Sequence, residues 1–156
     1  MKNNINLELS DEERKKFRTN KIRKSSVLEY SPGELEQLLG LSKERAKEIY
    51  ALADFQQIPS IGLKFAKDLL FLGYFSVDEL VGKDGAKLTD EYERKKGYII
   101  DPCVEDQFRL AVDFAKNRDF TKQWWDFTAE RKKYRKEKGY PKERPMKNWT
   151  EAYGIV

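Results

Sequence analysis

A short turn between two helical segments constrains this chain more than any other feature of its sequence. Residues 58–62 read Ile-Pro-Ser-Ile-Gly, so a proline and a glycine interrupt the helical spacing of the apolar residues. A new amphipathic pattern begins immediately afterwards, with Ala66 at a close-packing position and Leu69 one turn later. The sequence therefore predicts two helices joined by a tight turn, the second beginning at Leu63.

The start of this second helix is a candidate site for an anion. Backbone N–H groups in a first turn have no intrahelical partner, and the positive end of the helix macrodipole lies there. The arrangement looks like a helix-hairpin-helix element, which grips the nucleic-acid backbone without reading bases. The residues that would contact DNA phosphate are Ile61, Gly62, Leu63, Lys64, Phe65 and Lys67. The alternative is that the turn only redirects the chain between two helices.

Two small residues in the turn carry specific expectations. Ser60 stands where the common hairpin form has glycine, at a position after Pro59 that tends to need a positive φ. That conformation costs roughly 1 kcal/mol for a residue with a Cβ. Gly62 is expected where the backbone passes close to a helix or a phosphate, so Gly62→Ala is expected to damage folding and binding together.

A weak internal repeat accompanies the turn. A shift of 20 residues superimposes Gly40 on Ser60, Leu41 on Ile61 and Ala46 on Ala66. Residues 38–46 therefore resemble a second, degenerate hairpin that involves Gly40, Ser42 and Lys43, with Ser42 as a helix cap. Coincidental helical periodicity is the alternative explanation.

The rest of the chain also predicts helices. Caps, glycines and apolar spacing indicate helices at about 11–24, 32–39, 43–53, 63–72, 85–96 and 121–138, a short one from 76 and one from 102. No convincing strand alternation is found, so the predicted class is all-α. We expect a charged N-terminal extension at 1–30, a compact helical domain at 31–138 and a C-terminal tail at 139–156.

The absence of histidine excludes many catalytic classes. It removes the commonest general base, the Cys–His and Ser–His nucleophile pairs and most zinc sites. No glycine loop of a nucleotide-binding type is present. We therefore expect no catalytic residue, cofactor, metal or small-molecule substrate, although a carboxylate–metal nuclease is left open.

The single cysteine, Cys103, has no partner for an intramolecular disulfide. Val104, Phe108, Ala111 and Ala115 follow it at helical spacing, so Cys103 is predicted to be a buried apolar residue and not a nucleophile. No apolar run is long enough to cross a membrane. These features predict a cytoplasmic protein without membrane contact.

The net charge of +4 is unevenly distributed. Residues 1–30 carry a net +3, residues 31–120 a net −4 and residues 121–148 a net +6. The last segment contains a predicted basic helix with Arg131, Lys132, Lys133, Arg135 and Lys136. We expect these side chains to supply much of any DNA affinity, or else to form a solvated face. Trp124 and Phe127 are expected to pack onto the body of the protein.

Several segments together resemble one known family. They are residues 58–62, Ala66 and residues 69–74, then Asp-Pro-Cys-Val at 101–104, the helix at 108–115 and Trp-Trp-Asp-Phe at 124–127. Over roughly residues 55–131 the chain resembles the "pathogenicity locus" family of small bacterial helix-hairpin-helix proteins, sometimes labelled mitomycin-resistance-like. It is more distantly similar to the C-terminal domain of TfoX competence regulators. The resemblance implies a helix-hairpin-helix fold and a connection with DNA.

Two functional hypotheses follow. The first is a non-enzymatic, sequence-tolerant DNA-binding protein that contacts the phosphate backbone. The second is a helical protein–protein interaction module in which the hairpins are only structural, with a protein partner in place of DNA. The basic flanks favour the first hypothesis and the acidic middle of the chain favours the second.

Overall fold

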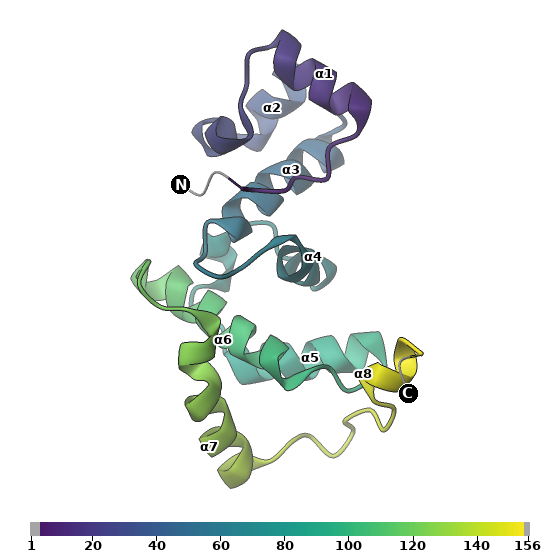
Figure 1. Ribbon diagram of the computed structural model, residues 1–156, viewed down its shortest axis with the longest axis vertical. Helices are drawn as coiled ribbons and strands as arrows, with labels where there is room; N and C mark the ends of the chain where they lie inside the picture. The colour runs from purple at the N-terminus through teal and green to yellow at the C-terminus, as the bar shows by residue number, and fades with distance from the viewer. Residues whose placement is uncertain (1–3, 155–156) are drawn as a thin grey trace. The chain divides into compact units, whose positions relative to one another are not determined.

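The computed structural model describes residues 4–154, and the regular structure in this part of the chain is helical (Figure 1). The α-helices are α1 (Asp11–Thr19), α2 (Pro32–Leu39), α3 (Lys43–Gln56), α4 (Leu63–Phe71), α5 (Gly85–Lys96), α6 (Pro102–Asn117), α7 (Thr128–Lys138) and α8 (Trp149–Ala152). The short 3-10 helices are η1 (Lys24–Glu29), η2 (Val77–Leu80) and η3 (Trp124–Phe127). The all-α prediction is confirmed.

The chain divides into two compact units, Met1–Glu79 (unit 1) and Leu80–Val156 (unit 2). Their boundary falls inside the segment 31–138 that the sequence assigns to one helical domain. Within the described residues, no helix combines the length and the apolar character that crossing a membrane requires.

Helix boundaries agree with the sequence where a cap marks them. Helix α2 begins after Ser31, whose hydroxyl accepts a hydrogen bond from the Glu34 N–H at 3.1 Å, and ends at Gly40 in the left-handed region. Helix ends that no cap marks differ from the prediction. Helix α1 stops at Thr19 because the chain turns at Lys21, which has a φ of 55°. Helix α7 starts at 128 because the preceding residues form η3.

The N-terminal segment contributes to the core of unit 1. Ile5, Leu7 and Leu9 are buried and alternate with exposed neighbours, as in an extended segment with one face inward. The Gln56 side chain holds the backbone of Asn6, accepting from its N–H at 3.1 Å and donating to its carbonyl at 2.7 Å. This segment, which the sequence assigns to a charged extension, is therefore packed against the core. Its apolar residues recur at every second position and not at helical spacing.

Arg45 on α3 fastens this segment and α1 to the rest of unit 1. Its Nε lies 2.7 Å from Glu13 Oε2, and its Nη2 donates to the carbonyl of Glu8 at 3.0 Å. The hydrogen bond from Arg45 lowers the pKa of Glu13, and the same bond raises the pKa of Arg45. One guanidinium thus joins three parts of unit 1.

Helices α5 and α6 form the centre of unit 2, where they pack closely. The Tyr92 and Phe108 rings lie 5.7 Å apart. A Cβ at Gly85 would lie 2.7 Å from the Arg109 Cγ and 2.8 Å from its Cα, so only glycine fits there. The predicted apolar stripe of α6 is confirmed at Phe108, Ala111 and Ala115, all of which are buried.

The C-terminal segment returns to the end of α5 (Figure 1). The Ile99 N–H donates to the Lys147 carbonyl, and the Trp149 N–H donates to the Ile99 carbonyl, both at 2.7 Å. Arg144 contacts Glu93, whose side chain is 1% exposed, at 2.9 Å. The segment from Gly139 to Gly154 is therefore fastened to unit 2 by an ion pair and a short β-bridge.

Gly85→Ala is expected to lower the free energy of unfolding of unit 2 by about 1–3 kcal/mol, because the new methyl group overlaps backbone atoms of α6. Urea unfolding followed by tryptophan fluorescence measures this, since Trp124, Trp125 and Trp149 all lie in unit 2. The matched control is Gly33→Ala, followed by circular dichroism. Its Cβ would come no closer than 3.9 Å to any atom, so that variant is expected to be neutral or stabilised. Equal stability of Gly85→Ala and the parent would contradict the close packing.

Candidate functional site

The turn between α3 and α4 has the backbone conformation that its sequence predicts. Ser60 has a φ of 61°, which confirms the expected positive value at this non-glycine position. Its hydroxyl donates to the Pro59 carbonyl at 2.6 Å, and the Ile61 N–H donates to the Ile58 carbonyl at 3.2 Å. Ile58 and Ile61 are 0% and 2% exposed, so apolar contacts on both sides hold the turn in place.

The N-terminus of α4 lacks the side-chain caps found elsewhere in the described chain. Six other α-helices are capped by the side chains of Ser10, Ser31, Ser42, Asp84, Asp101 and Asn148. Helix α7 is also uncapped, but it continues directly from η3. The N-cap residue of α4 is Gly62, which has no side chain to offer, and the first turn of the helix contains no acidic residue. The positive end of its macrodipole is therefore not offset by an N-cap side chain or by a carboxylate of the first turn.

Only some of the residues predicted to contact phosphate lie at the surface. Gly62 and Lys64 are exposed, whereas Phe65 is 2% exposed and anchors the helix in the core. Leu63 is half-buried. Lys67 is exposed, but its Nζ lies 3.1 Å from Glu8 Oε1. The surface that an anion would meet is therefore the backbone at 62–64 together with the Lys64 side chain.

The expected role of Gly62 in folding is corrected by the structure. Its φ is −113°, an ordinary extended value, and a Cβ built there would meet nothing within 4 Å. Alanine therefore fits at this position without strain or overlap. A side chain at residue 62 would matter only to a molecule that approaches the start of α4 from outside.

Residues 38–46, which the sequence aligns with the turn at 58–62, share one positive φ with that turn and differ from it in the cap of the following helix. Gly40 has a φ of 58°, close to the 61° of Ser60, with which the repeat aligns it. Lys43 is exposed. However, the Ser42 hydroxyl accepts from the Arg45 N–H at 3.1 Å, and the first turn of α3 contains an acidic residue. The first turn of α3 therefore already has a side-chain cap and a carboxylate from its own chain.

The predicted basic helix divides into two groups of side chains. Arg131 Nε lies 2.6 Å from Oδ1 of Asp106, which is 0% exposed. Arg135 is 7% exposed and lies 2.9 Å from both Glu105 and Asp90. Burial disfavours the charge of both guanidinium groups, but the bound carboxylates outweigh it and raise the pKa of each. These two arginines attach α7 to α6 and α5 and are not available as surface phosphate contacts.

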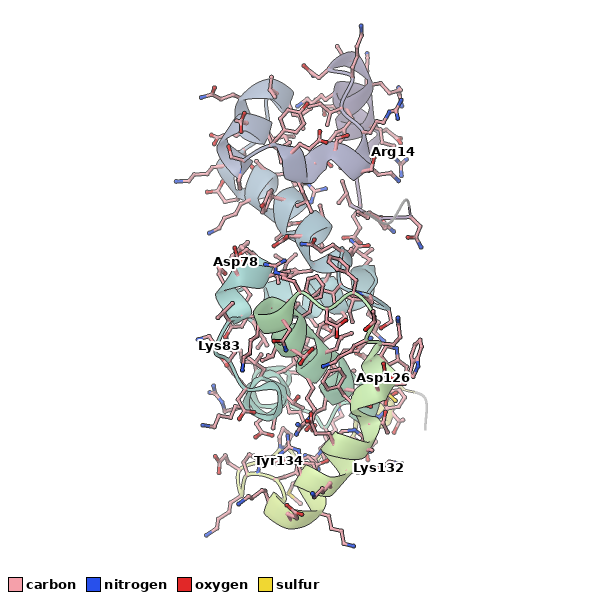
Figure 2. The ribbon with its side chains drawn as sticks, turned by 90° about the vertical axis from the view of Figure 1, so that its left-hand side faces the viewer. Arg14, Asp78, Lys83, Asp126, Lys132 and Tyr134 are labelled. Atoms are coloured by element: carbon pink, nitrogen blue, oxygen red, sulfur yellow. The ribbon has the colours of Figure 1, made fainter. Side chains whose placement is uncertain are left out.

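The second group comprises the lysines of α7. Lys132, Lys133 and Lys136 are exposed, and Figure 2 shows Lys132 on a different side of α7 from Tyr134. The Arg109 guanidinium lies over the Tyr134 ring, with its Cζ 4.9 Å from the ring centroid. The cationic surface of α7 is therefore made by lysine. Nearby, Phe127 is buried as expected, Trp124 is half-buried and Trp125 is exposed.

The predicted burial of Cys103 is wrong. Cys103 is the second residue of α6 and is exposed, although Leu110 and Phe114, which lie on nearly the same side of the helix, are buried. Its exposure therefore reflects its place at the end of the helix. Partial burial and the nearby Asp101 carboxylate raise the pKa of the thiol, which disfavours the reactive thiolate. Within residues 4–154, no group of three or more Cys, Asp or Glu side chains is arranged to hold a metal ion.

Comparison with known proteins gives a relation at the level of the family. The model of the family described as "pathogenicity locus" matches residues 48–133, more than half of the chain. Mitomycin resistance protein McrB of Streptomyces lavendulae is 27% identical over 81 residues, which cover 52% of this chain and 76% of that protein. No solved structure matches the chain. Neither description denotes a catalytic activity.

Arg131→Ala is expected to lower the free energy of unfolding of unit 2 by about 3–5 kcal/mol, because it leaves the Asp106 carboxylate buried without its counter-ion. Lys132→Ala, one residue away on the exposed face, is expected to change it by less than about 0.5 kcal/mol. Urea unfolding followed by tryptophan fluorescence compares the two variants. Similar small effects of both substitutions would show that Arg131 does not act as a structural residue.

Proposed function

Because the chain belongs to the pathogenicity locus family and the match spans the turn at 57–62, we propose that α3, this turn and α4 form a helix-hairpin-helix element that binds DNA. In this proposal the backbone N–H groups at the start of α4 contact a phosphate, and Lys64 adds its charge. Such contacts fix a protein on the duplex without reading the base sequence. The protein would act as a sequence-tolerant binder and would not catalyse a reaction.

The uncapped start of α4 is the observation that supports this proposal most. Every other α-helix of the described chain that follows a loop has a side chain bound to its first N–H groups, and several have a carboxylate there too. Helix α4 has neither, and it presents a glycine with open space around it. An external phosphate is the kind of group that such a terminus accepts.

The charge available to this contact is modest. Unit 1 has 13 basic and 13 acidic residues and is neutral, whereas unit 2 has 18 basic and 14 acidic residues, a net +4. The hairpin alone would therefore bind weakly. In our proposal Lys132, Lys133 and Lys136 add a salt-dependent contribution, because each lysine that neutralises a phosphate releases counter-ions.

The neutrality of unit 1 also favours a second candidate function. If the hairpin served only as structure, the protein would be a helical interaction module with a protein partner. The two functions differ in one measurable respect, since only the first requires an anion at the start of α4.

Lys64→Glu is expected to weaken DNA binding about fivefold or more at moderate salt, and to make the plot of log affinity against log salt shallower by about 0.9. Fluorescence anisotropy with two labelled duplexes of unrelated sequence, over a range of salt concentrations, measures both quantities. The fold should be unaffected, because a carboxylate in the first turn of α4 is favourable for the helix.

The control is Lys43→Glu, which makes the same charge change at the start of α3, where Ser42 already caps the helix. Gly62→Ala tests the same contact from the backbone side, and it is expected to keep the parent's thermal stability while binding less DNA. If Lys64→Glu bound DNA as well as the parent, or as well as Lys43→Glu, the hairpin proposal would be rejected in favour of the interaction module.

Replacing Lys132, Lys133 and Lys136 together by Glu is expected to reduce DNA affinity and to lower the salt slope by up to about 2.7, because up to three phosphate contacts are lost. This set avoids Arg131 and Arg135, whose replacement would disturb the fold. The matched control replaces three other exposed lysines of the same unit by Glu, namely Lys87, Lys116 and Lys142. Equal losses in both triple variants would show a general effect of net charge and no specific role for α7.

A further inference from the structure

Unit 1 contains an apolar groove that the proposed DNA contact does not use. It has a volume of about 240 Å³ and lies between the extended N-terminal segment, α1 and the residues that follow α1. Its apolar walls are Leu7, Leu9, Phe17 and Ile22, all buried side chains of the unit 1 core. The groove is therefore a built part of the fold and not a gap between mobile side chains.

Three cations surround these apolar walls. Arg14, Arg18 and Lys24 line the groove, and no carboxylate does. Arg14, at the outer edge of α1 in Figure 2, pairs with the exposed Asp11 at 3.3 Å. Within residues 4–154, no carboxylate pairs with Arg18 or Lys24, and both side chains are exposed. The groove thus combines an apolar floor with a positive rim on which Arg18 and Lys24 have no carboxylate partner among the described residues.

The size of the groove limits what can fill it. Pockets for drug-sized ligands usually have volumes of about 300–1,000 Å³, so this groove is too small for most of them and suits one large side chain. Phe17 is the single aromatic wall of the groove, whereas surfaces that bind single strands stack successive bases on several aromatic rings. These two observations favour an aliphatic or aromatic side chain of a protein over a nucleotide.

We propose that this groove docks an acidic segment of a partner protein, which inserts one large apolar side chain between Leu7, Leu9, Phe17 and Ile22. Acidic residues on either side of that side chain pair with Arg14, Arg18 and Lys24. A buried central anchor within a charged rim is the arrangement that concentrates binding energy at small protein interfaces. The rim charges supply orientation and a faster encounter with an acidic partner.

The test uses the full chain and a set of fluorescein-labelled peptides. Each peptide is a short run of Asp, Glu and Gly around one central Leu, Ile, Phe or Trp, and a matched peptide has Ser at the centre. Fluorescence anisotropy is expected to show that the best apolar peptide binds about tenfold or more tightly than the Ser peptide. Methyl resonances of Leu7, Leu9 and Ile22 are expected to shift when it binds.

Two double variants separate the groove from general charge effects. Arg18→Glu with Lys24→Glu is expected to weaken peptide binding about tenfold or more. Lys15→Glu with Arg23→Glu makes the same change of net charge at exposed residues that do not line the groove, and it is expected to have a much smaller effect.

Four results would overturn the proposal. The first is that no peptide binds at concentrations up to about 1 mM, and the second is that the Ser peptide binds as well as the best apolar peptide. The third is an equal loss in the two double variants. The fourth is displacement of the peptide by a single-stranded oligonucleotide that shifts the same methyl resonances, which would assign the groove to nucleic acid. Since Lys64 does not line the groove, loss of the DNA proposal would leave these measurements unaffected.

Discussion

Arg135 contacts three segments of unit 2 with a single guanidinium group. Its Nε meets Glu105 of α6 and its Nη2 meets Asp90 of α5, while Nη1 donates to the carbonyl of Gly139 at the end of its own helix. Arg131 is the buried residue of helix α7, so the helix has little apolar surface with which to pack. Its attachment to the unit depends on these ion pairs, since removing one partner of a buried pair leaves the other charge unsolvated.

A division of roles between arginine and lysine follows from this arrangement. Buried or half-buried ion pairs are made by Arg45, Arg109, Arg131, Arg135 and Arg144, whereas the lysines of α7 remain at the surface. The planar guanidinium group makes several directed hydrogen bonds and is more weakly hydrated than an ammonium group, so it suits buried pairs. A net charge counted along the sequence therefore overstates the charge that α7 can offer to a phosphate.

Local signals in the sequence were sufficient for the all-α class, for both ends of α2 and for the positive φ of Ser60. Local signals could not predict which side chains, distant in the sequence, meet in the folded protein. The burial of Arg131 and Arg135 depends on Glu105 and Asp106, which come about 25–30 residues earlier. The alternation at 5–9 was a readable signal that was missed. Cys103 is exposed because it lies in the first turn of α6, an end effect that apolar spacing does not reveal. The DNA contact and the predicted domain boundaries remain predictions.

The ion pair between Glu93 and Arg144 has a consequence for biosynthesis. The two residues are 51 positions apart, and the bridge of Ile99 with Asn148 closes a similarly long loop. Unit 1 has its own long closure, from Asn6 to Gln56, but all of its residues precede position 80. During synthesis, unit 1 can therefore complete its fold while unit 2 still waits for its closing segment. For that interval the ribosome carries a finished first unit and a second one in which Glu93 has not yet met Arg144.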